Sequence, residues 1–270
     1  MKRIALAQMN SSDQLPKNLD QALLLVEEAA AFGVALIAFP ETFLFIGGRK
    51  DIFSIAEEIP GNITSIFREM ALKHKISILL GSIIEKSPDT SEKFYNTSVL
   101  INNMGEITGQ YRKIHLFDIE LPQYRFYESD YYLPGSKIIT CDHEIAKIGM
   151  TICYDLRFPS LFSKLADDGA QLIFVPAAFT LETGKDHWIA LLRARAIENQ
   201  VYIAAPAQFG KHQGNRSTFG NSVIIDPWGT VLCQAPYKTG LIYADIDLEY
   251  LNQTRAHMPI YQHKVKKIDN

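Results

Sequence analysis

The chain has 270 residues, of which 47% are hydrophobic and 21% charged, and its formal net charge is -3. These values are typical of an ordinary folded protein at the upper end of single-domain size. They argue against a general nucleic-acid surface, and no apolar run approaches the roughly 20 residues that a membrane-spanning helix needs.

The start of the chain superficially resembles a signal peptide, because Lys2 and Arg3 precede the apolar residues 4–7. Polar residues from Gln8 onward interrupt that segment too early, so we expect a β-strand and a cytoplasmic protein. The three cysteines are odd in number and widely spaced, which argues against a disulfide framework. The seven histidines show no metal-ligand spacing, and we expect no metal site.

Helical and extended patterns alternate along the chain, which predicts an α/β fold. The first helix, residues 17–32, has an apolar face and is closed by Gly33. The other predicted elements are a helix at 63–74, a strand at 76–84, a hairpin of 94–101 with 107–111, a helix at 187–200, a strand at 201–205, and strands at 222–225 and 230–234 around a turn. Residues 117–134 are aromatic-rich and irregular, and a long loop inside a domain usually carries function.

An internal repeat accompanies this alternation. Residues 33–40 read GVALIAFP and residues 169–176 read GAQLIFVP, with Gly, Leu, Ile and Pro in common, and Glu41 after the first copy corresponds to Ala177. The repeat predicts two β-α-β halves related by a pseudo-two-fold axis, unless it is chance similarity between strands that follow helices. We find no linker and expect one domain, residues 1–270, ending in a tail at 260–270.

Cys153 lies in the most informative stretch, residues 150–159 (MTICYDLRFP). Apolar residues lead to the cysteine as in a buried strand, a polar turn follows, and Pro159 suits the first turn of a helix. Such a strand end can hold a thiol beside free backbone N–H groups, as attack on a carbonyl requires. The alternative is an inert buried cysteine, since free cysteine is among the most buried residue types.

Two charged residues stand in comparable surroundings. Glu41 follows the apolar run 34–37 within AFPETF, and Lys113 lies in the apolar-rich segment GQYRKIHL, residues 109–116. Taken alone, each is more often a solvated surface charge.

The three segments together resemble the carbon–nitrogen hydrolase (nitrilase) superfamily, whose members carry Glu, Lys and Cys in this chain order. The similarity includes Pro-Glu-Thr, Tyr-Arg-Lys-Ile-His and Cys-Tyr-Asp-Leu-Arg-Phe-Pro, and it extends over residues 4–263. It implies a single-domain, four-layer α-β-β-α sandwich that assembles into a homodimer or a higher homo-oligomer. It further implies a small-molecule amide substrate and no cofactor, nucleic acid or membrane as partner.

The resemblance also implies a role for each site residue. Glu41 would take the proton from Cys153, Lys113 would stabilise the oxyanion, and the backbone N–H of Tyr154 would be a second donor. Cys153 would carry a thioester that water then hydrolyses. Glu128 would be the second glutamate that this family often places near the lysine, although on its own it reads as an exposed loop carboxylate.

Substrate-binding residues are expected beside the cysteine and after the second repeat. Arg157 suits bidentate binding of a substrate carboxylate, and its alternative is a structural salt bridge, for example with Asp155. Phe179, Thr180 and Thr183 follow the second repeat and are expected to line the pocket. Trp188 is expected in the core, and His115 as a hydrogen-bonding framework residue.

Four segments, 183–188, 191–198, 207–210 and 226–230, look like the deaminated glutathione amidase branch of the superfamily. That likeness implies hydrolysis of deaminated glutathione to 2-oxoglutarate and cysteinylglycine. The alternative is an ω-amidase acting on 2-oxoglutaramate and 2-oxosuccinamate, because Asn221 stands where the glutathione branch usually has histidine. A catalytically idle binding or scaffold protein is the non-enzyme alternative, and the complete Glu41, Lys113 and Cys153 set argues against it.

Overall fold

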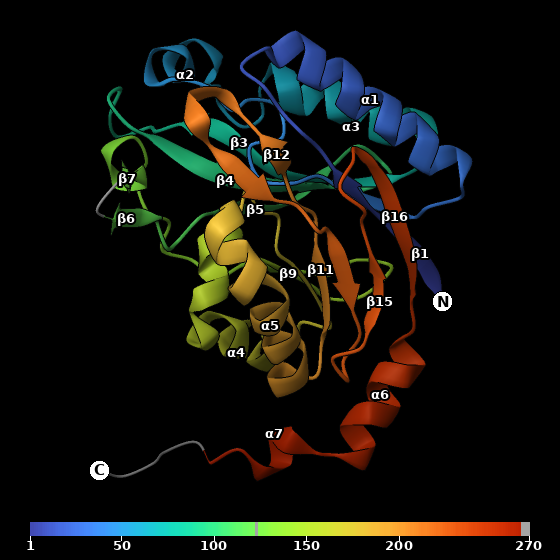
Figure 1. The fold of residues 1–270 in the computed structure, drawn as a ribbon. Helices are drawn as coiled ribbons and strands as arrows, with labels where there is room; N and C mark the ends of the chain where they lie inside the picture. Colours follow the sequence, from blue (N-terminus) through green and yellow to red (C-terminus); the bar gives the residue numbers. More distant parts are fainter. Residues whose placement is uncertain (122–123, 266–270) are drawn as a thin grey trace.

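Two β-sheets, each of six strands, stack face to face at the centre of the computed structural model, which describes residues 1–121 and 124–265 (Figure 1). The strands of the first sheet, in spatial order, are β16 (Gly240–Ile246), β1 (Lys2–Gln8), β2 (Leu36–Ala38), β3 (Ser77–Lys86), β4 (Phe94–Ile101) and β5 (Ile107–Arg112). Those of the second are β15 (Val231–Gln234), β14 (Val223–Ile225), β11 (Tyr202–Ala205), β10 (Leu172–Phe174), β9 (Ile148–Met150) and β8 (Thr140–Cys141).

Helices cover the outer face of each sheet. The first sheet is covered by α1 (Leu15–Ala31) and α3 (Asn62–His74), and the second by α4 (Pro159–Asp167) and α5 (Leu181–Asn199) (Figure 1). The other helices are α2 (Arg49–Ile55), α6 (Leu248–His257) and α7 (Ile260–His263). The α-β-β-α order that the resemblance implies is therefore confirmed.

The two sheets share one pattern of strand directions. In the first, β1, β2 and β3 are parallel, β4 and β5 continue antiparallel, and β16 flanks β1 antiparallel. In the second, β9, β10 and β11 are parallel, β14 and β15 continue antiparallel, and β8 flanks β9 antiparallel. The repeated segments form β2 and β10, which occupy equivalent positions, so the repeat reflects two halves of the same topology.

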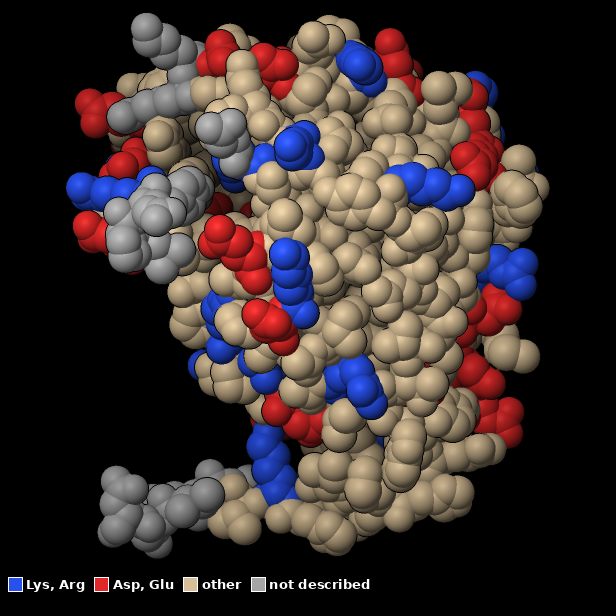
Figure 2. All heavy atoms as spheres, in the orientation of Figure 1, with Lys and Arg blue, Asp and Glu red and all other residues tan. Residues whose placement is uncertain are grey.

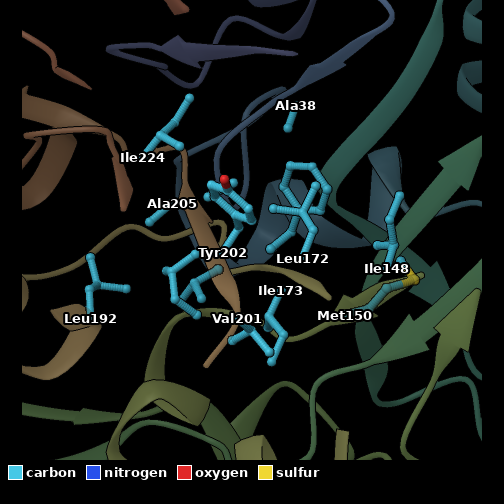
Figure 3. Packing of buried hydrophobic residues seen from close by; sticks show 14 of the residues in the cluster. Ala38, Ile148, Met150, Leu172, Ile173, Leu192, Val201, Tyr202, Ala205 and Ile224 are labelled. Carbon is cyan, nitrogen blue, oxygen red and sulfur yellow. The ribbon is translucent and has the colours of Figure 1, made fainter. Parts of the chain in front are cut away.

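Side-chain alternation along the strands separates two cores. In β1, Ile4 and Leu6 face the second sheet, whereas Ala5 and Ala7 face the helices. Figure 3 shows the packing around Leu172 and Tyr202 in the core that contains Ile4 and Leu6. Burial of a large apolar side chain stabilises a fold by about 1.5–3 kcal/mol, so strands buried on both faces hold the sheets together strongly.

Three predictions from the sequence differ from the structure. The segment 117–134 contains regular secondary structure: β6 (Asp118–Leu121) and β7 (Tyr124–Tyr127) pair antiparallel, and the 3₁₀ turn η1 (Glu128–Asp130) follows. Helix α5 begins at Leu181 rather than at 187, because Gly184 lets its first turns approach the ring of Phe219.

The predicted tail, 260–270, begins with α7. There the Tyr261 hydroxyl lies 3.3 Å from the Asn199 carbonyl oxygen, to which it donates. The remainder, 266–270, lies outside the described residues.

The molecular surface carries charges of both signs. On the face shown in Figure 2, basic and acidic side chains are interspersed rather than gathered by sign. In the ranges 1–121 and 124–265, each helix is too short or too polar to span a lipid bilayer.

Gly81 allows a close backbone contact that positions the end of β2. It lies in an irregular stretch of β3, between Leu80 and Ile83, where the register with β4 shifts. A Cβ atom at this position would overlap the carbonyl oxygens of Phe39 and Pro40, which directly precede Glu41. The end of β2 is therefore fixed by a contact that tolerates only glycine.

We expect Gly81→Ala to lower the free energy of unfolding by about 2–3 kcal/mol, as overpacking does, because backbone must move to admit the methyl group. Gly48→Ala is the control, since its Cβ would lie 3.5 Å from the nearest atom and its φ is -82°. That substitution should lower the free energy of unfolding by at most about 1 kcal/mol. Equal losses for the two variants in chemical denaturation would show that the contact at Gly81 has no special role.

Candidate active site

Three residues distant in sequence meet in one buried cluster. Glu41 follows β2 of the first sheet, Lys113 follows β5 of the same sheet, and Cys153 follows β9 of the second. Their exposed fractions are 5%, 2% and 8%. The cluster lies beyond the carboxyl ends of parallel strands, where polar groups of open α/β sheets commonly converge.

The Lys113 ammonium lies between two carboxylates. Its Nζ is 2.9 Å from Glu41 Oε1 and 2.8 Å from Glu128 Oε2. Glu128 is 5% exposed, so the alternative of an exposed loop carboxylate is wrong. The Asn96 amide donates to Glu41 at 3.0 Å and to Glu128 at 3.1 Å, which ties the two carboxylates together.

Backbone N–H groups complete the coordination of both carboxylates. Ala178 donates to Glu41 Oε2 at 2.9 Å, and Phe117 donates to Glu128 Oε2 at 2.6 Å. Each oxygen atom of the two carboxylates thus has at least one donor, as buried charges require.

Burial and the neighbouring charges determine the protonation states of Glu41, Lys113 and Cys153. Burial acts to raise the pKa of Glu41, but the Lys113 ammonium and hydrogen bonds from Lys113, Cys153 and Ala178 outweigh it and hold the pKa below its ordinary value. Burial and the Glu41 charge raise the pKa of the Cys153 thiol well above its usual range. Burial alone would lower the pKa of Lys113, but Glu128 and Glu41 raise it. The resting cluster therefore contains a thiol beside a carboxylate and an ammonium.

Cys153 has an uncommon backbone conformation. Its φ is +47°, in the left-handed region that costs a non-glycine residue roughly 1–2 kcal/mol, and its N–H donates to the Pro176 carbonyl at 2.9 Å. The cysteine opens the 3₁₀ turn η2 (Cys153–Arg157), and Pro159 then starts α4 as the sequence predicts. The N–H of Tyr154 is at the second position of that turn, where N–H groups have no partner within the helix.

Asp155 joins the lysine segment to the cysteine segment. Its fully buried carboxylate accepts from the Tyr111 hydroxyl at 2.7 Å and from the Ile152 N–H at 2.9 Å. It also lies 2.7 Å from His115 Nδ1 and accepts from the His115 N–H at 3.1 Å. Tyr111 and His115 flank Lys113, and Ile152 precedes Cys153, so one carboxylate fixes both segments relative to each other. His115 is therefore a framework residue, as expected.

The expected substrate-binding residues lie in different surroundings. The Arg157 guanidinium lies over the rings of Phe179, at 5.1 Å, and Tyr154, at 5.8 Å. Because the oxygen atoms of Asp155 are occupied as described, the alternative salt bridge from Arg157 to Asp155 is wrong. Tyr154 is partly exposed, whereas Phe179 is only 4% exposed and packs on the buried Trp188.

Two threonines lie at the N-terminus of α5, Thr180 just before the helix and Thr183 in its first turn. The hydroxyls of Thr180 and Thr183 lie 2.6 Å apart, and both side chains are partly exposed. Each therefore has one hydroxyl contact within the pair.

Sequence reasoning missed Asn96, Ala178, and the link that Asp155 makes. A signal for Asn96 was present, since the polar run Asn96-Thr97-Ser98 interrupts a strand that is otherwise apolar or aromatic. The backbone N–H groups of Ala178 and Phe117 carry no side-chain signal. Among the residues described, no group of three His, Cys, Asp or Glu side chains is arranged to hold a metal ion.

Comparisons with known proteins agree with this architecture. The family profile described as "Carbon-nitrogen hydrolase" matches residues 3–256. The chain is 41% identical to the deaminated glutathione amidase of Synechocystis sp., covering 97% of each chain. It is 38% identical to that of Dictyostelium discoideum, covering 100% of this chain and 95% of the relative.

A solved structure supports the same assignment. The NitFhit protein of Caenorhabditis elegans superposes with a TM-score of 0.92 at 37% identity. The match covers 97% of this chain but only 65% of the NitFhit chain. With a profile and full-length relatives in agreement, the chain belongs to the carbon–nitrogen hydrolase family, within the nitrilase superfamily.

Proposed function

We propose that this protein is an amidase that hydrolyses a small carboxylate-bearing amide through a thioester on Cys153. The observation that carries the proposal is the buried contact of Glu41 and Lys113 beside the Cys153 thiol. A thiol is a weak nucleophile until a base removes its proton, and Glu41 is a charged base within hydrogen-bonding reach.

The first half of the reaction forms the acyl-enzyme. The Cys153 sulfur attacks the amide carbon while its proton moves to Glu41, and the carbonyl oxygen gains the negative charge. Lys113 Nζ and the Tyr154 N–H stabilise that oxyanion. When the C–N bond breaks, Glu41 returns the proton to the departing amine, and the thioester remains.

The second half releases the acid. Water attacks the thioester carbon as Glu41 takes one of its protons, and the C–S bond then breaks. The proton returns from Glu41 to sulfur, which restores the resting thiol. Glu128 keeps Lys113 in place throughout, because its two oxygens bind Nζ at 2.8 and 3.0 Å.

Deaminated glutathione is the substrate we favour, with 2-oxoglutarate and cysteinylglycine as products. The relatives from Synechocystis sp. and Dictyostelium discoideum, which carry that activity in their names, support this choice at 41% and 38% identity. Asn221, which departs from the expected histidine, has φ of +58°. Asn and His are both enriched in this left-handed region, so the exchange preserves the backbone.

Cys153→Ala should lower kcat by at least about 10³-fold, because no other group can form the thioester. The matched control is Cys233→Ala, which removes a partly exposed thiol of β15. Intact-protein mass spectrometry during turnover should show an acyl adduct on the wild-type protein and none on Cys153→Ala. Full activity of Cys153→Ala would disprove covalent catalysis by this residue.

The acid limb of the pH profile should lie at low pH. Glu41 must be ionised to act as base, and the Lys113 ammonium beside it holds its pKa below the ordinary glutamate value of 4.5. We therefore expect kcat/KM to stay level as pH falls from neutral and to decline only below that value, where Glu41 takes up a proton. Circular dichroism at each pH separates this loss from unfolding. A decline centred near neutral pH would identify another essential group.

Deaminated glutathione should be hydrolysed with a kcat/KM at least about tenfold above that for 2-oxoglutaramate, if the leaving cysteinylglycine contributes binding energy to the transition state. Steady-state assays of both amides on one enzyme preparation measure the ratio. A ratio of one or below would favour the ω-amidase assignment and leave the thioester chemistry unchanged.

A further inference from the structure

A row of three partly exposed aromatic rings lies beside the buried cluster, and a guanidinium lies at each end of it. Phe126 and Phe117 have ring centroids 6.1 Å apart, and Phe117 and Tyr154 have centroids 5.1 Å apart. Arg216 lies 5.1 Å from the Phe126 centroid, and Arg157 lies 5.8 Å from that of Tyr154. We refer to Phe126, Phe117 and Tyr154 as the aromatic row.

The aromatic row is continuous with the catalytic cluster. Tyr154 directly follows Cys153, and the backbone N–H of Phe117 donates to Glu128. The row is therefore attached through the backbone to both the cysteine and the carboxylate that holds Lys113. The row has the character of a substrate surface, since flat rings offer contact area to amide groups and alkyl chains alike.

Arg216 reaches this place from a separate hairpin, formed by β12 (Phe209–Lys211) and β13 (Ser217–Phe219). The hairpin is fixed to the second half of the fold, because the Phe219 N–H donates to the Phe179 carbonyl at 2.9 Å and Thr218 bridges to Thr180. Arg216 thus lies at the Phe126 end of the aromatic row, and Arg157 lies at the Tyr154 end.

Arg216 and the charged cluster both act on Tyr132. Burial raises the pKa of Tyr132, and the charges of Glu128, Glu41, Lys113 and Arg216 all act on the same phenol. The Arg216 charge therefore acts on a buried phenol that the charges of Glu128, Glu41 and Lys113 also reach.

Both arginines have guanidinium groups available to an anion. Among the described residues, neither Arg157 nor Arg216 forms an ion pair with a carboxylate. Each instead lies over aromatic rings, and Arg157 Nη1 is 3.3 Å from His187 Nδ1. A partly exposed guanidinium on a ring keeps most of its five N–H donors available, and its planar fork fits a carboxylate in bidentate fashion.

We propose that Arg157 and Arg216 bind two carboxylates at opposite ends of one substrate, a dianionic amide whose central part lies along the aromatic row. Arg157 is on the same rigid 3₁₀ turn as the sulfur, so it holds the carboxylate of the acyl half, which stays bound as the thioester. Arg216 holds the carboxylate of the leaving amine. The inference rests on the proposed amidase function and extends it to a specificity-determining residue, Arg216.

Arg216→Gln should raise KM for deaminated glutathione, which has a carboxylate in both halves, and lower kcat/KM by roughly 10–100-fold through loss of a charged hydrogen-bonded pair. The same variant should leave kcat/KM for 2-oxoglutaramate, whose amine is ammonia, within about twofold. Arg157→Gln should lower kcat/KM for both amides. Arg216→Lys, which keeps the charge without the fork, should fall between the wild type and Arg216→Gln for deaminated glutathione.

Arg125→Gln is the matched control. Arg125 lies in the β6–β7 hairpin, is exposed, and covers the Tyr127 ring at 4.4 Å, so it has a similar ring contact away from the aromatic row. This variant should leave kcat/KM unchanged for both amides. Equal losses for both amides in Arg216→Gln, or no loss for either, would overturn the proposal and indicate a purely structural role for Arg216.

Binding to the Cys153→Ala protein separates this proposal from the proposed reaction. Calorimetry should show weaker binding of deaminated glutathione after Arg216→Gln is added, and unchanged binding of 2-oxoglutaramate. That result would support the carboxylate site even if the wild-type protein hydrolysed neither compound. Hydrolysis of deaminated glutathione without any Arg216-dependent difference in binding would retain the amidase and reject the site.

Discussion

The contact of one ammonium with two carboxylates, Lys113 with Glu41 and Glu128, is the constraint on which the arrangement of the site depends. Removing charged groups from water costs several kcal/mol for each ion, and close pairing must offset that cost. Here the three charges are at most 5% exposed and approach within 2.8–2.9 Å. Asn96 and the N–H groups of Ala178 and Phe117 supply the remaining donors, so each segment that carries one of these groups must be in place before the cluster is stable.

The duplicated topology explains how the cluster is assembled. Glu41 follows β2 in one half, and Ala177 takes the equivalent position after β10 in the other. The half without the carboxylate contributes the next backbone N–H, from Ala178, which binds Glu41 Oε2. The two repeats therefore differ in role, one supplying the charge and the other a donor that orients it. Asp155 adds a second link, since it binds Tyr111 and His115, two residues before and after Lys113, and the backbone N–H of Ile152 before Cys153.

The sequence predicts the layers of the fold, most strands, and the site residues Glu41, Lys113 and Cys153. Strand ends and family motifs are local patterns, so they can be recognised without the structure. It does not predict that Asn96 joins two carboxylates, since that depends on the pairing that puts the Asn96 carbonyl within 2.9 Å of the Lys113 N–H. It also misses the β6–β7 hairpin, where the pairing of Asp118 with Tyr127 organises a segment without clear alternation. The sequence gives no signal for Arg216, because its contact with Phe126 joins two hairpins that are distant along the chain.

The protonated state of Cys153 has a consequence for the durability of the protein. Oxidants and alkylating compounds react with thiolates, and their rate depends on how much thiolate is present and how accessible it is. The Cys153 thiol has a raised pKa, so little thiolate is present at rest, and at 8% exposure the sulfur is poorly accessible. In the proposed reaction, a carbonyl carbon placed next to sulfur lets the thiol proton move to Glu41, so the reactive thiolate forms only when a bound amide can consume it. The proposed reaction thus combines a strong nucleophile during turnover with an unreactive thiol at rest.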